Sequence, residues 1–135
     1  MASPLRRSAL ALGLAVASVA GCAAPRSLPA GHGEDAARET LSRFARDVQE
    51  RRWQDAYALL AARWRAAYTP SRLAADWDGA GPIGREESER VLALLAAGVS
   101  LLPEGGLERL SLPVGTGRRA VVVLEDGGWR VDALE

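Results

Sequence analysis

The apolar residues of this chain change their spacing once, and this change constrains the fold more than any other feature. Across residues 34–98 they recur every three or four positions, as on one face of a helix. Across residues 109–133 they alternate with polar residues, as in strands buried on one face. The chain therefore predicts an α+β fold, in which N-terminal helices pack on a small curved antiparallel sheet.

Four amphipathic stripes make up the helical part. The first begins at Glu34, and its opposite face carries charged pairs at i,i+4 spacing, which we expect to lie in solvent: Glu39 with Arg43 and Asp47 with Arg51. The positions that mark the four stripes are Ala37, Leu41, Phe44 and Val48; Trp53, Tyr57, Leu60, Trp64 and Tyr68; Leu73 to Trp77; and Ile83, Glu87, Val91, Leu94, Leu95 and Gly98.

Capping and turn residues separate these stripes. A polar break at Glu50 to Arg52 predicts the end of the first helix or a kink in it. Thr69-Pro70 is typical of an N-cap followed by proline at the first helical position. The segment from Asp78 to Pro82 has the composition of a turn, so we expect the third helix to end there.

Three strands are expected near the C-terminus. In the first, Leu110, Leu112 and Val114 alternate with polar residues, and a turn at Gly115-Thr116-Gly117 leads into a second strand from Arg118 to Glu125. Asp126-Gly127-Gly128 is typical of a hairpin turn. The last strand places Trp129, Val131 and Ala133 on one face, and Arg130 and Asp132 on the other.

The N-terminal residues 1–21 have the features of a secretory signal. Arg6 and Arg7 precede an apolar stretch from Ala9 to Ala20, and no acidic residue occurs before Cys22. That stretch is about a dozen residues long, whereas a helix needs roughly 20 to span a bilayer. A cleaved leader is therefore the better interpretation than a transmembrane helix.

The end of this leader, Val19-Ala20-Gly21-Cys22, resembles the lipobox of bacterial lipoproteins. The resemblance implies cleavage between Gly21 and Cys22, a diacylglyceryl group on the Cys22 sulfur, and acylation of the new N-terminus, commonly by palmitate. It further implies a cell-envelope location, and Ala23 after the cysteine suits the outer membrane, facing the periplasm, if the source is Gram-negative. Ordinary signal cleavage that leaves a free thiol is the alternative.

Cys22 is the only cysteine, so no intramolecular disulfide is expected. Residues 22–33 are rich in Ala, Pro, Gly and Ser and predict a flexible tether, in which we expect His32 to be a solvated linker residue. Residues 34–135 are enough for one domain that buries its own core. Neither an internal repeat nor a second domain is apparent.

The charge balance gives no general attraction to nucleic acid. The precursor has 17 basic and 17 acidic residues, and loss of the leader removes two arginines and leaves the chain slightly acidic. Every basic residue is arginine, because the chain has no lysine. The presence of an arginine at a given position therefore does not by itself indicate an anion-binding site.

The run from Phe44 to Leu60, ending in Trp53-Gln54-Asp55-Ala56-Tyr57-Ala58-Leu59-Leu60, and the closing hairpin with Gly128-Trp129-Arg130-Val131-Asp132 resemble the nuclear transport factor 2-like superfamily. The resemblance covers most of residues 34–135 and implies a cone-shaped α+β roll. One departure is the helix from Ile83 to Gly98, where many members have a strand. We therefore expect a reduced roll with a shallower cavity, or a different helix-on-sheet fold.

That superfamily includes isomerases, dehydratases, polyketide cyclases, ligand carriers and scaffolds, so the resemblance implies no single activity. Its enzymes commonly place an Asp with a His or Tyr inside the cone. Here the carboxylates nearest the aromatic stripe are Asp55 and Asp76, and Asp132 lies on the polar phase of its strand. We expect all three in solvent, although a buried one could act as a base.

The aromatic residues are candidates for either the core or the wall of a ligand cavity. These candidates are Phe44, Tyr57, Trp64, Tyr68, Trp77 and Trp129. No motif for a nucleophile, a metal or a nucleotide occurs, so the sequence predicts no catalytic residue, metal or cofactor. Two hypotheses follow: a non-catalytic lipoprotein that binds a small apolar ligand, an envelope protein or a second copy of itself, or a small cofactor-independent isomerase, cyclase-like enzyme or hydrolase.

Overall fold

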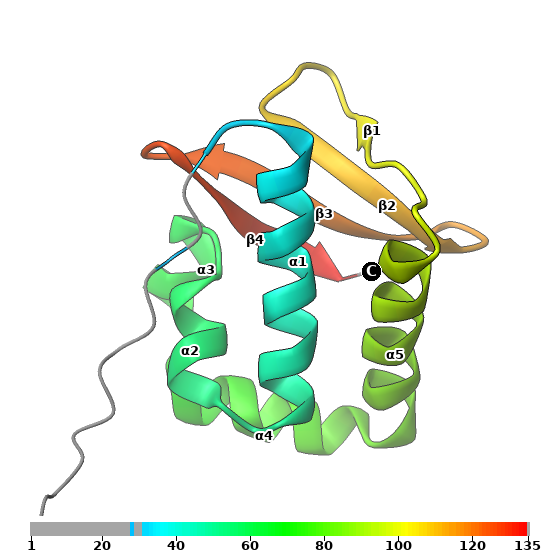
Figure 1. Ribbon diagram of the computed structural model, residues 1–135. Helices are drawn as coiled ribbons and strands as arrows, with labels where there is room; N and C mark the ends of the chain where they lie inside the picture. The colour runs from blue at the N-terminus through cyan, green and yellow to red at the C-terminus, as the bar shows by residue number, and fades with distance from the viewer. Residues whose placement is uncertain (1–27, 29–30, 135) are drawn as a thin grey trace, which may run out of the picture.

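The computed structural model describes residue 28 and residues 31–134. Within them, five helices pack on one side of a four-stranded antiparallel sheet, which is curved and unclosed (Figure 1). The α+β class predicted from the change of apolar spacing is therefore confirmed. The proposed lipidation site Cys22 and its cleavage point lie outside the described residues.

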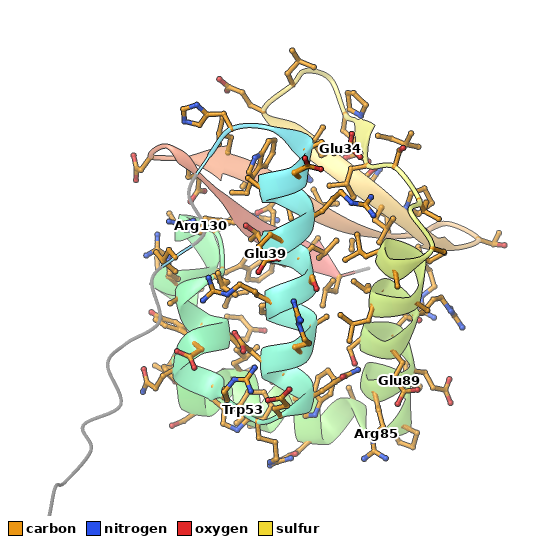
Figure 2. All side chains as sticks on the ribbon, in the orientation of Figure 1. Glu34, Glu39, Trp53, Arg85, Glu89 and Arg130 are labelled. Atoms are coloured by element: carbon orange, nitrogen blue, oxygen red, sulfur yellow. The ribbon has the colours of Figure 1, made fainter. Side chains whose placement is uncertain are left out.

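Helix α1 lies at the centre of the helical layer, where it contacts α5 and β4 (Figure 1). The apolar stripe of α1 is fully buried, as predicted. Glu39 on the opposite face of α1 is exposed (Figure 2). The helices are α1 (Glu34–Gln49), α2 (Trp53–Ala58), α3 (Ala62–Ala67), α4 (Pro70–Ala80) and α5 (Pro82–Ala96).

The second apolar stripe forms two short helices, α2 and α3, instead of the continuous helix that its spacing predicts. Between them the backbone pairs with β4: the Val131 N–H donates to the Leu59 carbonyl, and the Ala61 N–H donates to the Val131 carbonyl, each over 2.8 Å. These backbone groups thus find partners in the sheet, and Leu60 forms an isolated parallel bridge with Val131.

The start of α4 is confirmed, whereas the turn predicted after it is too long. The Thr69 hydroxyl accepts a hydrogen bond from the Arg72 backbone N–H over 3.1 Å, as an N-cap does. The helix then continues through Asp78 to Ala80. Gly81, with a φ of 56° that favours glycine, separates α4 from α5.

The sheet is a simple meander in the order β1-β2-β3-β4. Its two-residue edge strand β1 was not predicted, because both of its residues are exposed and carry no alternation. The strand from Arg118 to Glu125 has the bounds that the sequence predicts, and the strand before it extends to Gly115, the first residue of the predicted turn. The strands are β1 (Leu102–Pro103), β2 (Arg109–Gly115), β3 (Arg118–Glu125) and β4 (Gly128–Leu134).

The alternation predicted for β4 is interrupted by a bulge. Val122 on β3 pairs with Val131, but the next residue along, Val121, pairs with Ala133, so Asp132 is the extra residue. Trp129 and Val131 belong to the core beneath the helices, as predicted. Asp132, in contrast, is buried, although its place in the predicted alternation puts it on the polar face.

Polar contacts fix the two central helices to each other. The Gln49 amide donates to the Ser88 hydroxyl over 2.9 Å. The Arg38 guanidinium donates to the carbonyls of Leu95 and Val99 at the C-terminal end of α5, where the free carbonyls of a helix favour a cation. These contacts hold α1 against α5, and both helices contribute residues to the pocket described next.

Candidate functional site

An open pocket of about 360 Å³ lies between the helices and the C-terminal strand. Its lining is predominantly apolar and comes from α1, α3, α4, α5, β4 and the start of β3. The lining residues are Phe44, Val48, Leu60, Trp64, Tyr68, Leu73, Asp76, Trp77, Ala80, Ile83, Gly84, Glu87, Arg118, Val131, Asp132, Ala133 and Leu134.

The floor of the pocket is part of the hydrophobic core. Phe44 and Val48 reach it from α1, and Leu60 and Val131 reach it from the parallel bridge. All four side chains are at least nine-tenths buried. The floor is therefore a closely packed apolar surface, which suits contact with an apolar group.

Aromatic side chains form one wall. Trp64 and Tyr68 meet edge to face, with ring centroids 5.6 Å apart. The Trp64 indole N–H donates to the Asp132 carbonyl at the bulge, which ties α3 to β4. Trp77 on α4 completes the wall and packs at 6.4 Å from Trp53, which lies outside the pocket.

Glycine allows α5 to approach this wall. A Cβ built on Gly84 would lie 3.2 Å from the Ala80 Cβ and 3.4 Å from the Trp77 ring. A side chain at position 84 would therefore crowd the Ala80 Cβ and touch the Trp77 ring. Glycine at this position lets α5 begin close to both.

A first carboxylate at the pocket, Asp76, is neutralised by its neighbours. It accepts hydrogen bonds from the Tyr68 hydroxyl over 2.6 Å and from the Arg72 guanidinium over 3.0 Å. The hydrogen bond from Tyr68 has the larger effect and the one from Arg72 the next, and both hold the pKa of Asp76 below its ordinary value. The same bond to Asp76 is the main cause of the raised pKa of Tyr68. Neither group is tuned to exchange protons near neutrality.

A second carboxylate, Glu87 on α5, is shared by two arginines. The Oε1 atom of Glu87 lies 2.8 Å from the Arg118 guanidinium and 3.4 Å from that of Arg90. Arg90 also donates to the Val114 carbonyl over 3.2 Å, which fixes it against β2. This corner of the pocket therefore holds two positive charges beside one negative charge.

The third carboxylate corrects a prediction, because Asp132 is buried and not in solvent. Its side chain is only 6% exposed and lies 2.5 Å from the Arg63 guanidinium and 2.6 Å from that of Arg109. Burial by itself would raise the pKa of Asp132, but the hydrogen bonds from the two arginines outweigh it and leave the pKa lowered. The bulge in β4 permits this burial, since it removes Asp132 from the strict alternation of the strand.

Asp47 corrects a second prediction. The i,i+4 spacing pairs it with Arg51 in solvent, yet Asp47 is fully buried and accepts hydrogen bonds from Arg52, at 2.8 and 2.5 Å. Arg51, which has a positive φ of 58°, instead pairs with Asp78 on α4. The end of α1 turns the chain sharply, so the neighbour that reaches Asp47 comes from beyond the helix.

Four of the six aromatic candidates, Phe44, Trp64, Tyr68 and Trp77, line the pocket together. Tyr57 lies elsewhere, where its hydroxyl donates to the Arg65 carbonyl over 2.7 Å. Trp129 is 1% exposed and belongs to the core, not to the pocket lining.

Sequence reasoning missed the rim of the pocket. Ile83 was assigned to a buried stripe but is 62% exposed, and Leu134 is 41% exposed. The contribution of Arg118 was also missed, because it adjoins Glu87 only through the packing of α5 against the sheet. The one signal in the sequence for this charged part of the pocket was the position of Glu87 within an otherwise largely apolar stripe.

Comparisons with protein-family models, curated proteins and solved structures found no match to this chain. The resemblance to the nuclear transport factor 2-like superfamily stays a prediction. Among the residues that the structure describes, no helix has the length and apolar character needed to cross a bilayer. The same residues contain no group of three or more His, Cys, Asp or Glu side chains arranged to hold a metal ion.

Proposed function

We propose that this chain is a non-catalytic envelope lipoprotein, whose domain binds a small apolar ligand in the pocket between α1, α3, α4, α5 and β4. The observation that supports binding most strongly is the pocket itself, at about 360 Å³ with an apolar floor and an aromatic wall. Ligand pockets in proteins commonly span about 300–1,000 Å³ and have predominantly apolar linings with a few polar groups.

The exposed rim supports the same proposal. Ile83 and Leu134 are large apolar side chains left in water at the mouth of the pocket. Burial of apolar surface stabilises a complex by about 25 cal/mol per Å². A ligand that extends from the floor to the rim would gain contact with both.

The charged groups favour binding over catalysis. A general base works best when its pKa lies near the working pH. The pKa values of Asp76 and Asp132 are instead lowered, since each carboxylate accepts hydrogen bonds from neighbouring side chains. They serve in this account to fix the wall and β4 in position.

Binding is tested by isothermal titration calorimetry on the mature chain, which comprises residues 22–135 and carries Cys22→Ser. The ligand is dodecanol, a neutral molecule with a long alkyl group. The described core cluster is built from residues 37–131, all of which this shortened chain retains. We expect saturable binding that Trp77→Ala weakens at least tenfold. Trp53→Ala is the matched control, because Trp53 touches Trp77 from outside the pocket, and it should change affinity little. Absence of binding, with the chain folded, would contradict the proposal and favour a protein partner or a second copy.

The lipid anchor rests on the lipobox resemblance and has its own test. Expressed in a Gram-negative bacterium with labelled palmitate, the full chain should carry the label and fractionate with membranes, since two or more acyl chains are enough for stable anchoring. Cys22→Ala should lose both properties. An unlabelled chain that is secreted like the variant would indicate ordinary signal cleavage.

A further inference from the structure

We infer that the ligand of this pocket is a single-chain anionic amphiphile, such as a long-chain carboxylate, with its head group at Arg118 and its chain along the aromatic wall. This inference rests on the proposed apolar-ligand function and adds the chemistry of the head group. It follows from the distribution of charge around the pocket.

Arg118 is the only cationic residue among the described residues that line the pocket. It lies at the start of β3, and its side chain remains 43% exposed. A guanidinium presents several N–H donors in a fixed plane and suits a carboxylate geometrically. Arg118 therefore has both the charge and the access needed to bind an anionic head group.

The carboxylate that faces Arg118 is shared. Arg90 and Arg118 approach the same Oε1 atom of Glu87, and Arg90 is further engaged by the Val114 carbonyl. Glu87 is 16% exposed, and this corner carries one positive charge more than it carries negative charge. An incoming carboxylate would balance that charge.

The other two lining carboxylates offer no comparable attraction for a cation. Asp76 is paired with one arginine, Arg72, and also accepts the Tyr68 hydroxyl. The third lining carboxylate, Asp132, is paired with both Arg63 and Arg109. Each negative charge at the pocket is thus matched, and the excess charge is positive.

The test compares three ligands with alkyl chains of matched length, each added at pH 7.5 to the mature protein with Cys22→Ser. The two ionic ligands are kept below their micelle concentrations, and dodecanol is kept below its solubility limit. The ligands are laurate, dodecanol and dodecyltrimethylammonium. Binding is measured by titration calorimetry and by tryptophan fluorescence. We expect laurate to bind about tenfold or more tightly than dodecanol, and dodecyltrimethylammonium to bind more weakly than either.

Two variants locate the head group. Arg118→Gln should weaken laurate binding about tenfold and should affect dodecanol binding much less, so that the preference for laurate is lost. Glu87→Gln removes the competing carboxylate, so it should strengthen laurate binding severalfold, a gain that a damaged fold cannot produce. Arg119→Gln is the matched control, because Arg119 is adjacent in sequence but pairs with Glu104, outside the pocket lining.

The outcomes separate this inference from the function on which it rests. Equal binding of laurate and dodecanol, or tightest binding of the cationic ligand, would overturn the anionic head group and leave the apolar pocket standing. Equal laurate affinity in wild type, Arg118→Gln and Glu87→Gln would also overturn it. Failure of all three ligands to bind a folded chain would overturn both proposals.

Discussion

Replacement of Trp129 by alanine tests whether the core is arranged as described. The side chain is 1% exposed and heads the set of largest fully buried residues. A buried aromatic ring removes roughly 150–250 Å² from water, which at about 25 cal/mol per Å² corresponds to about 4–6 kcal/mol. Measured losses for such truncations are about 3–5 kcal/mol.

One detail places the expected value in the lower part of that range. The Trp129 Nε1 atom is buried and has no hydrogen-bond partner among the described residues. An unpaired buried donor costs about 1–3 kcal/mol, and the truncation removes this cost together with the ring. We therefore expect Trp129→Ala to lower the free energy of unfolding by about 3 kcal/mol, and Trp129→Phe to lower it by about 1 kcal/mol.

The assay is urea denaturation of the mature chain followed by far-ultraviolet circular dichroism, which does not depend on the tryptophan being removed. Trp53→Ala provides the control, because Trp53 is only partly buried and should cost less than Trp129→Ala. A loss below 1 kcal/mol for Trp129→Ala would mean that the ring does not fill the core. A loss for Trp129→Phe as large as that for alanine would show that Nε1 is hydrogen-bonded.

Three further predictions concern the ion pairs and caps. Asp132→Asn should lower the free energy of unfolding by about 2 kcal/mol at pH 7, measured with urea, because it removes charge-assisted hydrogen bonds at a buried position. The folded-state pKa of Asp132 is lowered, so its contribution to stability is full above the ordinary value near 4 and is lost as the pH falls through the folded-state value. The free energies of unfolding of the wild type and Asp132→Asn should therefore converge in acid. A constant difference between them down to pH 2 would refute this. Thr69→Ala should cost about 1 kcal/mol through loss of the α4 cap, whereas Thr116→Ala, in an exposed turn, should cost almost nothing; equal losses would remove the cap from the account.

The sequence predicts those parts of the fold that local signals determine. The α1 stripe, the cap at Thr69 and the bounds of β3 depend on residues a few positions apart, and each is confirmed. The hairpin at Asp126-Gly127 is confirmed for the same reason, because both residues adopt the positive φ that such a turn requires.

Features that depend on distant partners were not predicted. The helical spacing through Leu60 is real, but β4 offers the backbone there better partners than a continued helix. The burial of Asp132 depends on a bulge and on Arg63, an arginine from a helix far away in the chain. The spacing of apolar residues reveals neither the break between α2 and α3 nor the burial of Asp132, because it reflects the preferences of one segment alone.

The candidate site divides in the same way. Aromatic spacing singled out Trp64, Tyr68 and Trp77, but it could not separate wall residues from core residues such as Trp129. The charged corner at Glu87 and Arg118 joins α5 to β3 and has no signature in either segment alone. Its positive excess becomes visible only when the fold brings the two segments together.

Native mass spectrometry of the mature chain with Cys22→Ser tests the central claim most directly, if the protein is purified from bacteria without detergent. We expect an additional mass that disappears on denaturation and is absent from Trp77→Ala, because the pocket would retain an apolar ligand from the cell. A folded protein found only at its sequence mass, which also fails to take up dodecanol or laurate when these are added, would contradict the claim that the pocket binds an apolar ligand.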